Sequence, residues 1–347
     1  MTVYVGAIWK CRFFWLSLVK MDLASRYRGS VLGICWSLLH PIAMTAILCV
    51  VFKYAFKMPN MRTYAPLLFT GLTFWGFFSS VLVQGCGCFF HGESYIRQFP
   101  APMAIYPLRT VLGSAFHFAI GLLLAIGIAL LAGPAEPEEF KAAATRQHPA
   151  QVQTDSSTER VPLATPEVMA VLKAVGKHKA LSDSETKTVE KYIQTLESHA
   201  PKAEEKADKV DQAPEGHPTR AMQLMALPTL LPTLLLLLLF GWSMAILFGL
   251  LNVRFRDTRH LVEIGLQGLF YLTPIMYPIQ AMEGRFLGKL LHYNPLTPIL
   301  DLLIQPILYG RIPSLTTYAV AGLIVLSLSV TAAFALKIEE RRLIFHL

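Results

Sequence analysis

The sequence has few charged residues. Only 16% of its 347 residues are Asp, Glu, Lys or Arg, whereas 54% are hydrophobic. A soluble domain usually has about 25% charged and 45–50% apolar residues, so this composition argues against a pair of soluble domains. The charged residues are also unevenly distributed along the chain. Residues 134–222 hold 15 acidic and 12 basic residues, whereas all other positions together hold only 8 acidic and 19 basic residues. The sequence therefore indicates a membrane protein that carries one charged, soluble insertion.

The sequence also lacks the motifs of several functional classes. No Gly-x-x-x-x-Gly-Lys-Ser/Thr loop is present, so we expect no binding of ATP phosphates by this chain. His-Glu-x-x-His and Cys-x-x-Cys-His are absent as well. A catalytic site and attached haem therefore have no support, and we predict no catalytic residues, metal or cofactor in this chain.

Cysteines are absent from the charged insertion, so no disulfide framework is expected there. Cys86 and Cys88 lie near His91, but structural zinc sites usually need four ligands in spaced pairs. We interpret them as small buried residues near the end of a membrane span. The five cysteines are Cys11, Cys35, Cys49, Cys86 and Cys88.

Six long runs contain no Asp, Glu, Lys or Arg. About 20 mostly apolar residues let a helix cross a bilayer, and a helix satisfies its own backbone there. The runs show no alternation typical of strands, so we predict an all-α integral membrane protein with six transmembrane helices. The runs are residues 29–52, 63–92, 110–135, 221–253, 264–282 and 312–336. Pro274 and Pro278 break the fifth run, so we expect its helix to end early and to turn back at the outer leaflet.

The distribution of Lys and Arg predicts the orientation. If the N-terminus is cytoplasmic, thirteen basic residues lie in inner segments and six lie in outer ones. The positive-inside rule then places both termini in the cytoplasm and residues 134–222 outside, between spans three and four. The net charge of +8 thus reflects orientation, because a nucleic-acid binder would cluster its cations on one surface.

Four segments are predicted. Residues 1–28 begin without a compact signal peptide, and their mixture of aromatic and basic residues is typical of a cytoplasmic helix that lies in the membrane interface. Residues 29–133 hold spans one to three, and residues 223–347 hold spans four to six. Residues 134–222 are predicted to form a linker, a helical hairpin and a second linker. A binding role for this insertion and a merely tolerated surface insertion both stay open.

Four motif blocks lie next to the apolar runs. They are SRYRGSVLG (residues 25–33) leading to residues 36–41, IRQFPAP (residues 96–102), LNVRFRD (residues 251–257), and YLTPIMYP (residues 271–278) followed by NPLTP (294–298) and QPILYG (305–310). In this order and with six spans, they resemble the permease subunits of type 2 ATP-binding-cassette (ABC) exporters. The branch that they resemble exports lipid-linked polysaccharides such as O-antigen, capsule and teichoic acid.

The resemblance implies the partners. Two copies of the permease would assemble as a homodimer with two separate ABC ATPase subunits, which bind ATP and Mg. The complex would lie in the bacterial cytoplasmic (inner) membrane, contact membrane lipids, move a lipid-linked glycan and bind no nucleic acid. The block at residues 96–102 would correspond to the helix that docks on the ATPase. Its candidate coupling residues are Tyr95, Arg97, Phe99 and Pro100.

Two further sets of residues are predicted to contact substrate. Arg matches phosphate oxygens bidentately, so Arg26, Tyr27 and Arg28 are predicted to bind the pyrophosphate headgroup, with membrane anchoring as the alternative. Aromatic faces suit sugar rings, and a polar stripe in span five should avoid lipid. The predicted translocation path comprises Trp36, Phe52, Phe56, Phe74, Trp75, Glu263, Gln267, Phe270 and Tyr277.

Other functions stay open at this stage. The same fold could carry a drug or a lipid, and a receptor or scaffold could use residues 134–222 as its binding domain. His40 and His117 are isolated in the sequence, and we interpret both as hydrogen-bonded residues of the core.

Overall fold

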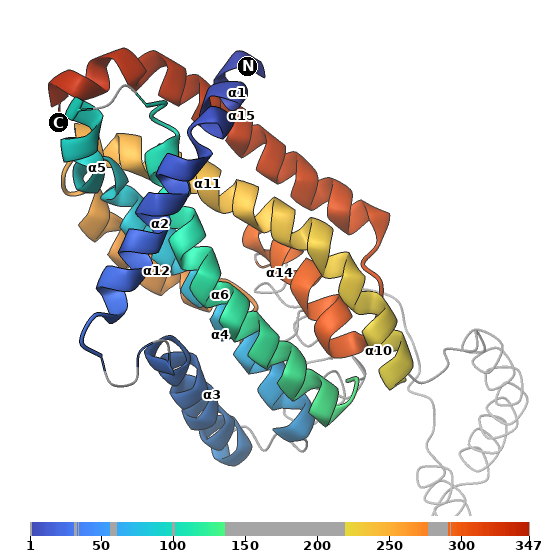
Figure 1. The fold of residues 1–347 in the computed structure, drawn as a ribbon. Coiled ribbons are helices and arrows are strands. Elements are labelled where there is room, and N and C mark those ends of the chain that lie inside the picture. The colour runs from blue at the N-terminus through green and yellow to red at the C-terminus, as the bar shows by residue number, and fades with distance from the viewer. Residues whose placement is uncertain are drawn as a thin grey trace, which may run out of the picture. The chain divides into compact units, whose positions relative to one another are not determined.

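The computed structural model describes residues 2–30, 33, 35–55, 61–98, 101–135, 219–276, 291 and 293–346. Within these ranges the regular structure is entirely helical (Figure 1). The helices are α1 (Thr2–Lys10), α2 (Arg12–Tyr27), α3 (Cys35–Ala55), α4 (Met61–Cys86), α5 (Cys88–Gln98), α6 (Ile105–Ala132), α10 (Arg220–Ala226), η1 (Leu227–Thr229), α11 (Leu230–Arg254), α12 (Thr258–Tyr271), α14 (Leu296–Ile304), η3 (Gln305–Tyr309) and α15 (Leu315–His346).

Five helices in the described ranges are long and apolar enough to cross a membrane. This supports the all-α membrane fold that the composition predicts, with five such helices where six runs were expected. They are Cys35–Tyr54, Met61–Cys86, Ile105–Ala132, Arg220–Arg254 and Leu315–Glu340.

The helix of the predicted fifth span, residues 264–282, ends early, as its prolines predict. Helix α12 has 14 residues and ends at Tyr271, and the chain then turns through residues 272–276. The turn includes Pro274, which lacks the N–H that an α-helix needs. Residues 277–282 lie outside the described ranges. A shorter apolar helical segment follows at Leu296–Tyr309.

Helix α4 is the centre of the packed core. It contacts α3, α6, α11, α12 and α14, and two thirds of its most apolar window is buried. Leu67, Phe74 and Val81 are fully buried along it. A helix with apolar residues on all sides is typical of a bundle interior, so α4 is the scaffold against which the other spans are placed.

Small residues let α11 approach α4 closely. A Cβ atom at Gly85 of α4 would lie 2.9 Å from the Cα of Ala245, and one at Gly249 would lie 2.9 Å from the Gly85 carbonyl oxygen. Gly241, Ala245 and Gly249 are spaced four residues apart on α11. This spacing is the small-residue pattern that allows helix backbones to pack closely within membranes.

The N-terminal segment forms two helices instead of the single interfacial helix that was expected. The break is at Cys11, whose backbone leaves the helical region with φ −86° and ψ 16°. Helix α2 packs along α6, and it buries Leu18 and Val19 while it exposes Phe13. The Arg12 guanidinium lies 4.6 Å from the centre of the Phe13 ring, a cation–π contact that suits a membrane interface.

A polar cluster joins the two ends of the described chain. The Tyr4 hydroxyl of α1 donates a hydrogen bond of 3.0 Å to Glu340 Oε1 of α15. The same carboxylate oxygen accepts a 3.4 Å bond from the Met103 N–H, and the Tyr4 oxygen accepts one from the Ala104 N–H. Burial, followed by the nearby Glu340 charge, raises the pKa of Tyr4 above its usual range. Trp242 of α11 also donates a hydrogen bond to the Ala104 carbonyl. Helices α1, α11 and α15 and the segment that precedes α6 therefore meet at this cluster.

The two edges of the charged insertion meet on the described part of the chain. Arg220 donates a hydrogen bond of 3.5 Å to the Leu131 carbonyl at the end of α6. The Ala135 N–H donates to the Leu308 carbonyl over 2.8 Å. The helical hairpin predicted within residues 134–222 lies outside the described ranges, so it stays a prediction.

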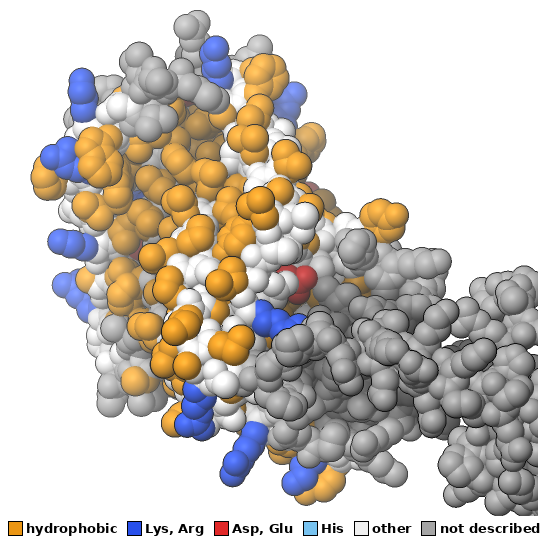
Figure 2. Space-filling view, turned by 90° about the vertical axis from the view of Figure 1, so that its right-hand side faces the viewer, with side chains coloured by type: hydrophobic (Ala, Val, Ile, Leu, Met, Phe, Trp, Pro, Cys, Tyr) orange, Lys and Arg blue, Asp and Glu red, His pale blue; other side chains and the backbone are white. Residues whose placement is uncertain are grey.

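The surface carries a large share of apolar side chains. On α15, Leu323, Leu326, Val330 and Phe334 are all more than half exposed. Figure 2 shows one face on which hydrophobic side chains predominate and most Lys and Arg side chains lie toward its margins. A soluble monomer rarely exposes so large an apolar area, whereas lipid chains can cover it.

Candidate functional site

A cavity of about 780 Å³ lies between the end of α2 and helices α3, α4 and α6. A cavity of this size is large enough for a small molecule or for part of a polymer. Its walls combine aromatic and polar groups, and several of the polar groups belong to long apolar helices. The lining includes Arg26, Tyr27, Trp36, Ser37, His40, Thr73, Trp75, Ser79, Ser80, Gln84, Ser114 and His117.

A chain of hydrogen bonds follows the polar wall of this larger cavity. The Arg26 guanidinium donates a bond of 2.9 Å to Gln84 Oε1, and the Gln84 amide donates in turn to Ser80 Oγ. Ser80 and Ser114 join α4 to α6 through a 3.0 Å bond. Polar side chains within membrane spans are costly unless they face protein or water. The wall therefore supports a polar path in this part of the bundle.

Tyr27 and His117 form a second contact between α2 and α6. The Tyr27 hydroxyl and His117 Nδ1 lie 2.8 Å apart, and the two rings meet edge to face with centroids 5.6 Å apart. His117 is thus hydrogen-bonded, as the sequence suggested, but it lines the cavity and is only half-buried. The contact holds the aromatic ring of Tyr27 at the cavity wall.

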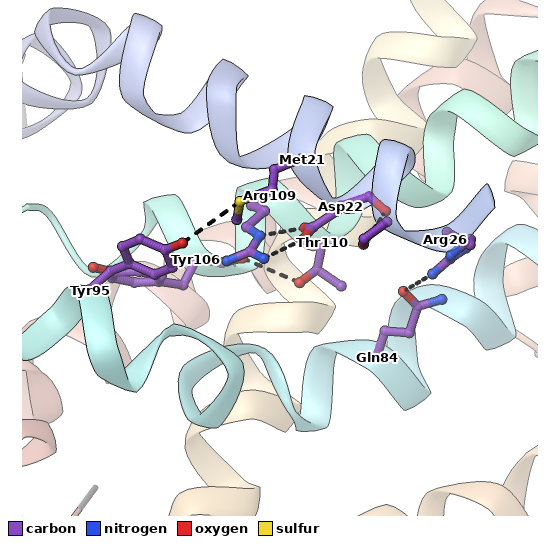
Figure 3. A network of polar contacts seen from close by, with 9 residues as sticks. Met21, Asp22, Arg26, Gln84, Tyr95, Tyr106, Arg109 and Thr110 are labelled. Carbon is purple, nitrogen blue, oxygen red and sulfur yellow. Dashed lines mark hydrogen bonds and ion pairs between the residues drawn. The ribbon is translucent and has the colours of Figure 1, made fainter. Parts of the chain in front are cut away.

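A smaller cavity of about 520 Å³ adjoins the larger one. On its wall, Arg109 of α6 forms a bidentate ion pair with Asp22 of α2 (Figure 3). The Arg109 side chain is 12% exposed and that of Asp22 is 39% exposed. Asp22 precedes Arg26 by one helical turn, so this pair fixes the register in which α2 presents Arg26 to the cavities. Arg26 and Gln84 line both cavities.

The structure separates the three predicted headgroup residues. Arg26 and Tyr27 line the larger cavity. Arg28 caps the end of α2 with an extended backbone and is exposed, and it is not among the lining residues of either cavity. The spacing along α2 therefore places two of the three side chains at the candidate substrate site.

The predicted path residues of spans one and two occupy different environments. Trp36 and Trp75 line the larger cavity. Phe52 packs on Tyr64, with ring centroids 5.2 Å apart. Phe74 is fully buried in the core and lies parallel to Phe78. Phe56 and Tyr277 lie outside the described residues.

Three predicted path residues lie on α12. Glu263 pairs with Arg259 on the same helix over 3.2 Å, and Gln267 is exposed. Phe270 meets Trp75 edge to face, with centroids 5.4 Å apart. Through this contact α12 reaches the aromatic side of the larger cavity.

The predicted coupling residues lie on and just after α5. Arg97 is exposed and forms a 2.9 Å ion pair with Glu93 one turn earlier. Tyr95 packs against α2, where its ring meets Phe14 edge to face at 6.1 Å and its hydroxyl lies 3.9 Å from Met21 Sδ (Figure 3). Phe99 and Pro100 lie outside the described residues. Helix α5 therefore contacts the helix that carries Arg26.

Several residues of the site were missed at the sequence level, among them Asp22, Ser80, Gln84 and Ser114. Ser80 and Gln84 lie four residues apart inside an apolar run, which places them on one helical face. That spacing was the available signal, and it could not by itself reveal what the face contacts.

Comparison with known proteins agrees with the expected family. Residues 221–308 match the family described as ABC-2 type transporter. The chain is 21% identical over 283 residues to the O-antigen export system permease protein RfbA of Klebsiella pneumoniae, which covers 82% of this chain and 75% of that protein. It is 26% identical over 127 residues to the RfbA permease of Myxococcus xanthus, which covers 36% of this chain and 48% of that protein.

These similarities confirm the resemblance to the permease subunits of type 2 ABC exporters. With the five long apolar helices, they support a multi-pass membrane protein.

Proposed function

We propose that this chain is the membrane permease of an ABC exporter that moves a lipid-linked polysaccharide, of the O-antigen, capsule or teichoic-acid type, across the bacterial inner membrane. The ABC-2 match and the similarity to O-antigen export permeases support the family and the substrate class. The observation that carries the proposal is the larger cavity. It joins the cation Arg26 to Trp36 and Trp75 among helices long enough to cross a membrane.

The cavity offers two kinds of contact that such a substrate needs. A guanidinium can bind phosphate oxygens through two hydrogen bonds. Indole rings present broad faces on which sugar rings can stack while polar edges remain hydrated. Weak stacking suits an exporter, because each repeat of the polymer must also be released.

A separate ATPase supplies the energy in this proposal and binds ATP and Mg²⁺. Helix α5 is the proposed docking element, and its exposed Arg97 would contact the ATPase. Phe99 and Pro100 stay candidate coupling residues on the sequence alone. Tyr95 faces α2 instead, so it would transmit a movement of α5 to the helix that ends at Arg26.

The same proposal includes the orientation of the chain in the membrane, the number of copies in the complex and a span formed by α12 in addition to the five long helices. The Lys and Arg distribution supports cytoplasmic termini and an external insertion at residues 134–222. The family resemblance supports a homodimer. Helix α12 and the apolar helical segment Leu296–Tyr309 would together serve as the fifth span.

The test is whether loss of the gene blocks export. Deletion should cause lipid-linked polymer to accumulate inside the cell and to disappear from the surface, and the intact chain should restore export. Normal surface glycan without internal accumulation would refute the proposal.

Arg26→Ala tests the site within the same cells. Loss of a charge-assisted hydrogen bond to phosphate should lower export roughly tenfold or more at unchanged subunit level. Lys20→Ala is the matched control, because Lys20 is an exposed cation on the same helix that lines neither cavity. Equal export by both variants would remove Arg26 from the substrate site.

A further inference from the structure

Among the described residues, two side chains line both cavities. The larger cavity has a volume of about 780 Å³ and the smaller one about 520 Å³. Arg26 of α2 and Gln84 of α4 are the residues that line both. A group that moves from one cavity to the other along this shared lining passes both side chains.

The two side chains are bonded to each other. Arg26 Nη2 donates to Gln84 Oε1 over 2.9 Å, which joins α2 to α4 across the wall (Figure 3). Gln84 is held in this orientation because its amide nitrogen donates to Ser80 Oγ. The amide oxygen consequently faces Arg26, and the bond spans the lining that the two cavities share.

The two arginines of the smaller cavity, Arg109 and Arg26, differ in the charge of the group that each one contacts. Arg109 on the wall of the smaller cavity is already paired with the Asp22 carboxylate. Among the described residues, Arg26 forms no ion pair, and its hydrogen-bond acceptor is the neutral Gln84 amide. Phosphate oxygens bind a guanidinium more strongly than an amide oxygen does. An arriving phosphate can therefore displace Gln84 from Arg26.

The linings of the two cavities also differ. The smaller cavity is lined largely by polar and charged residues, including Ser25, His91 and Thr110 besides the Asp22–Arg109 pair. The larger one adds the aromatic surfaces of Trp36, Trp75 and Phe77. The first lining suits a hydrated phosphate group, and the second suits sugar rings or an apolar chain.

We propose that the smaller cavity first receives the pyrophosphate-bearing end of an anionic lipid and that the Arg26–Gln84 bond closes the passage into the larger cavity. Binding of phosphate to Arg26 releases Gln84 and opens the passage. This inference rests on the proposed function for the identity of the substrate, but the closure itself can be measured without any polymer.

Two thiol reporters can measure access to each cavity separately. Ser25→Cys gives the small-cavity reporter and Ser79→Cys gives the large-cavity reporter, each by exchange of a single atom. Both are introduced into the full-length chain with the less buried native cysteines at positions 11, 35 and 49 replaced by Ser. Burial raises the pKa of Cys88, so its thiol reacts slowly, and the parent without a reporter measures the background. A charged thiol reagent is added to either side of membrane vesicles.

The labelling rate of the large-cavity reporter measures the passage. Gln84→Ala removes the acceptor and should raise this rate about tenfold or more, as expected for loss of a hydrogen bond to a charged group. Gln84→Glu replaces the neutral acceptor with a carboxylate and should lower the rate below that of the parent. The rate of the small-cavity reporter should stay unchanged in both variants. Ser17→Glu is the control for added charge, since Ser17 is exposed on α2 and lines neither cavity.

Farnesyl pyrophosphate is the probe for the phosphate site. It should slow labelling of the small-cavity reporter and speed labelling of the large-cavity reporter, and Arg26→Ala should abolish both effects. Farnesol, which lacks phosphate, should have neither effect. Inorganic pyrophosphate that reproduces the protection of the small-cavity reporter would show that the phosphate group alone is recognised.

Two results would overturn the inference. One is an unchanged rate of the large-cavity reporter in both Gln84→Ala and Gln84→Glu. The other is that farnesol protects the small-cavity reporter as well as farnesyl pyrophosphate does, or that farnesyl pyrophosphate does not protect it. Failure of the proposed function would look different, because export in cells would be normal without the chain whatever the labelling rates. Thiol access and polymer accumulation therefore test the two statements separately.

Discussion

The ion pair between Asp22 and Arg109 should decide whether α2 stays docked on α6. Asp22→Asn keeps the shape of the side chain and removes its charge, so Arg109 would lose its carboxylate partner. Exposed pairs contribute about 0.2–1 kcal/mol, whereas removal of one partner from a fully buried pair costs about 3–5 kcal/mol. With Arg109 12% exposed and Asp22 39% exposed, the pair lies between these limits.

A cost of about 2 kcal/mol is therefore expected for docking of α2. This corresponds to roughly a 30-fold rise in the population with α2 detached. Backbone amides of α2 should exchange with solvent faster by the same factor, since local opening limits their exchange. Amides in the core of α4 should keep their rates. Hydrogen exchange of the full chain in lipid nanodiscs, read by mass spectrometry, measures both helices at once.

A matched control exists on α5. Glu93→Ala breaks the pair with Arg97, in which both side chains are exposed, and exchange of α5 should change by no more than roughly twofold. The double variant of Asp22 and Arg109 should be affected less than the sum of the single variants, because the two residues act as a pair. Equal exchange of α2 in Asp22→Asn and the parent, or strictly additive effects, would refute the reasoning.

Three further predictions concern the scaffold. Gly249→Leu should lower stability by about 1–3 kcal/mol through overpacking of α11 against α4, read as a lower thermal midpoint, whereas Gly322→Leu, where a Cβ meets nothing within 4 Å, should behave like the parent. Replacement of residues 136–218 by a flexible linker of about six residues should preserve expression and folding, because Arg220 contacts the end of α6 and such a linker spans roughly 20 Å; a chain that aggregates on gel filtration would contradict this. Tyr4→Phe should lower the free energy of unfolding by about 1 kcal/mol at neutral pH, because one hydrogen bond is lost. Burial raises the pKa of Tyr4 in the folded state, so the parent should lose stability as pH rises above about 10, where the hydroxyl ionises in the unfolded chain. The variant should lose less stability over the same range, and thermal melts at several pH values measure this difference.

The apolar runs predicted the long helices because charged side chains are costly in lipid, so a membrane-spanning helix is visible in the sequence as a long stretch without charged residues. The run at residues 221–253 corresponds to the span Arg220–Arg254. The run at residues 63–92 covers α4 and the start of α5, since the chain breaks at Gly87 without a charged residue to mark the break. A count of charge-free residues could not distinguish one long helix from two. In residues 264–282 the prolines supplied the missing signal, and α12 does end at Tyr271.

The site was predictable only in part. Arg26 and Tyr27 are recognisable because two cations flank a Tyr at the start of an apolar run. Gln84 and His117 belong to the site because they contact Arg26 and Tyr27, which lie 58 and 90 positions earlier in the chain. Such partners depend on how α2 folds back along α6, which is a property of packing and leaves no local pattern in the sequence.

The cluster around Tyr4 and Glu340 has a consequence for biogenesis. These residues are 336 positions apart, so the Tyr4 hydroxyl and the Met103 N–H must wait for nearly the whole chain to be synthesised before they meet the Glu340 carboxylate. The segment between α5 and α6 therefore acquires its final set of partners last. A nascent chain stalled before Glu340 can already form the bond between Tyr4 and the Ala104 N–H, but it lacks the carboxylate that joins the Tyr4 hydroxyl and the Met103 N–H to the last helix.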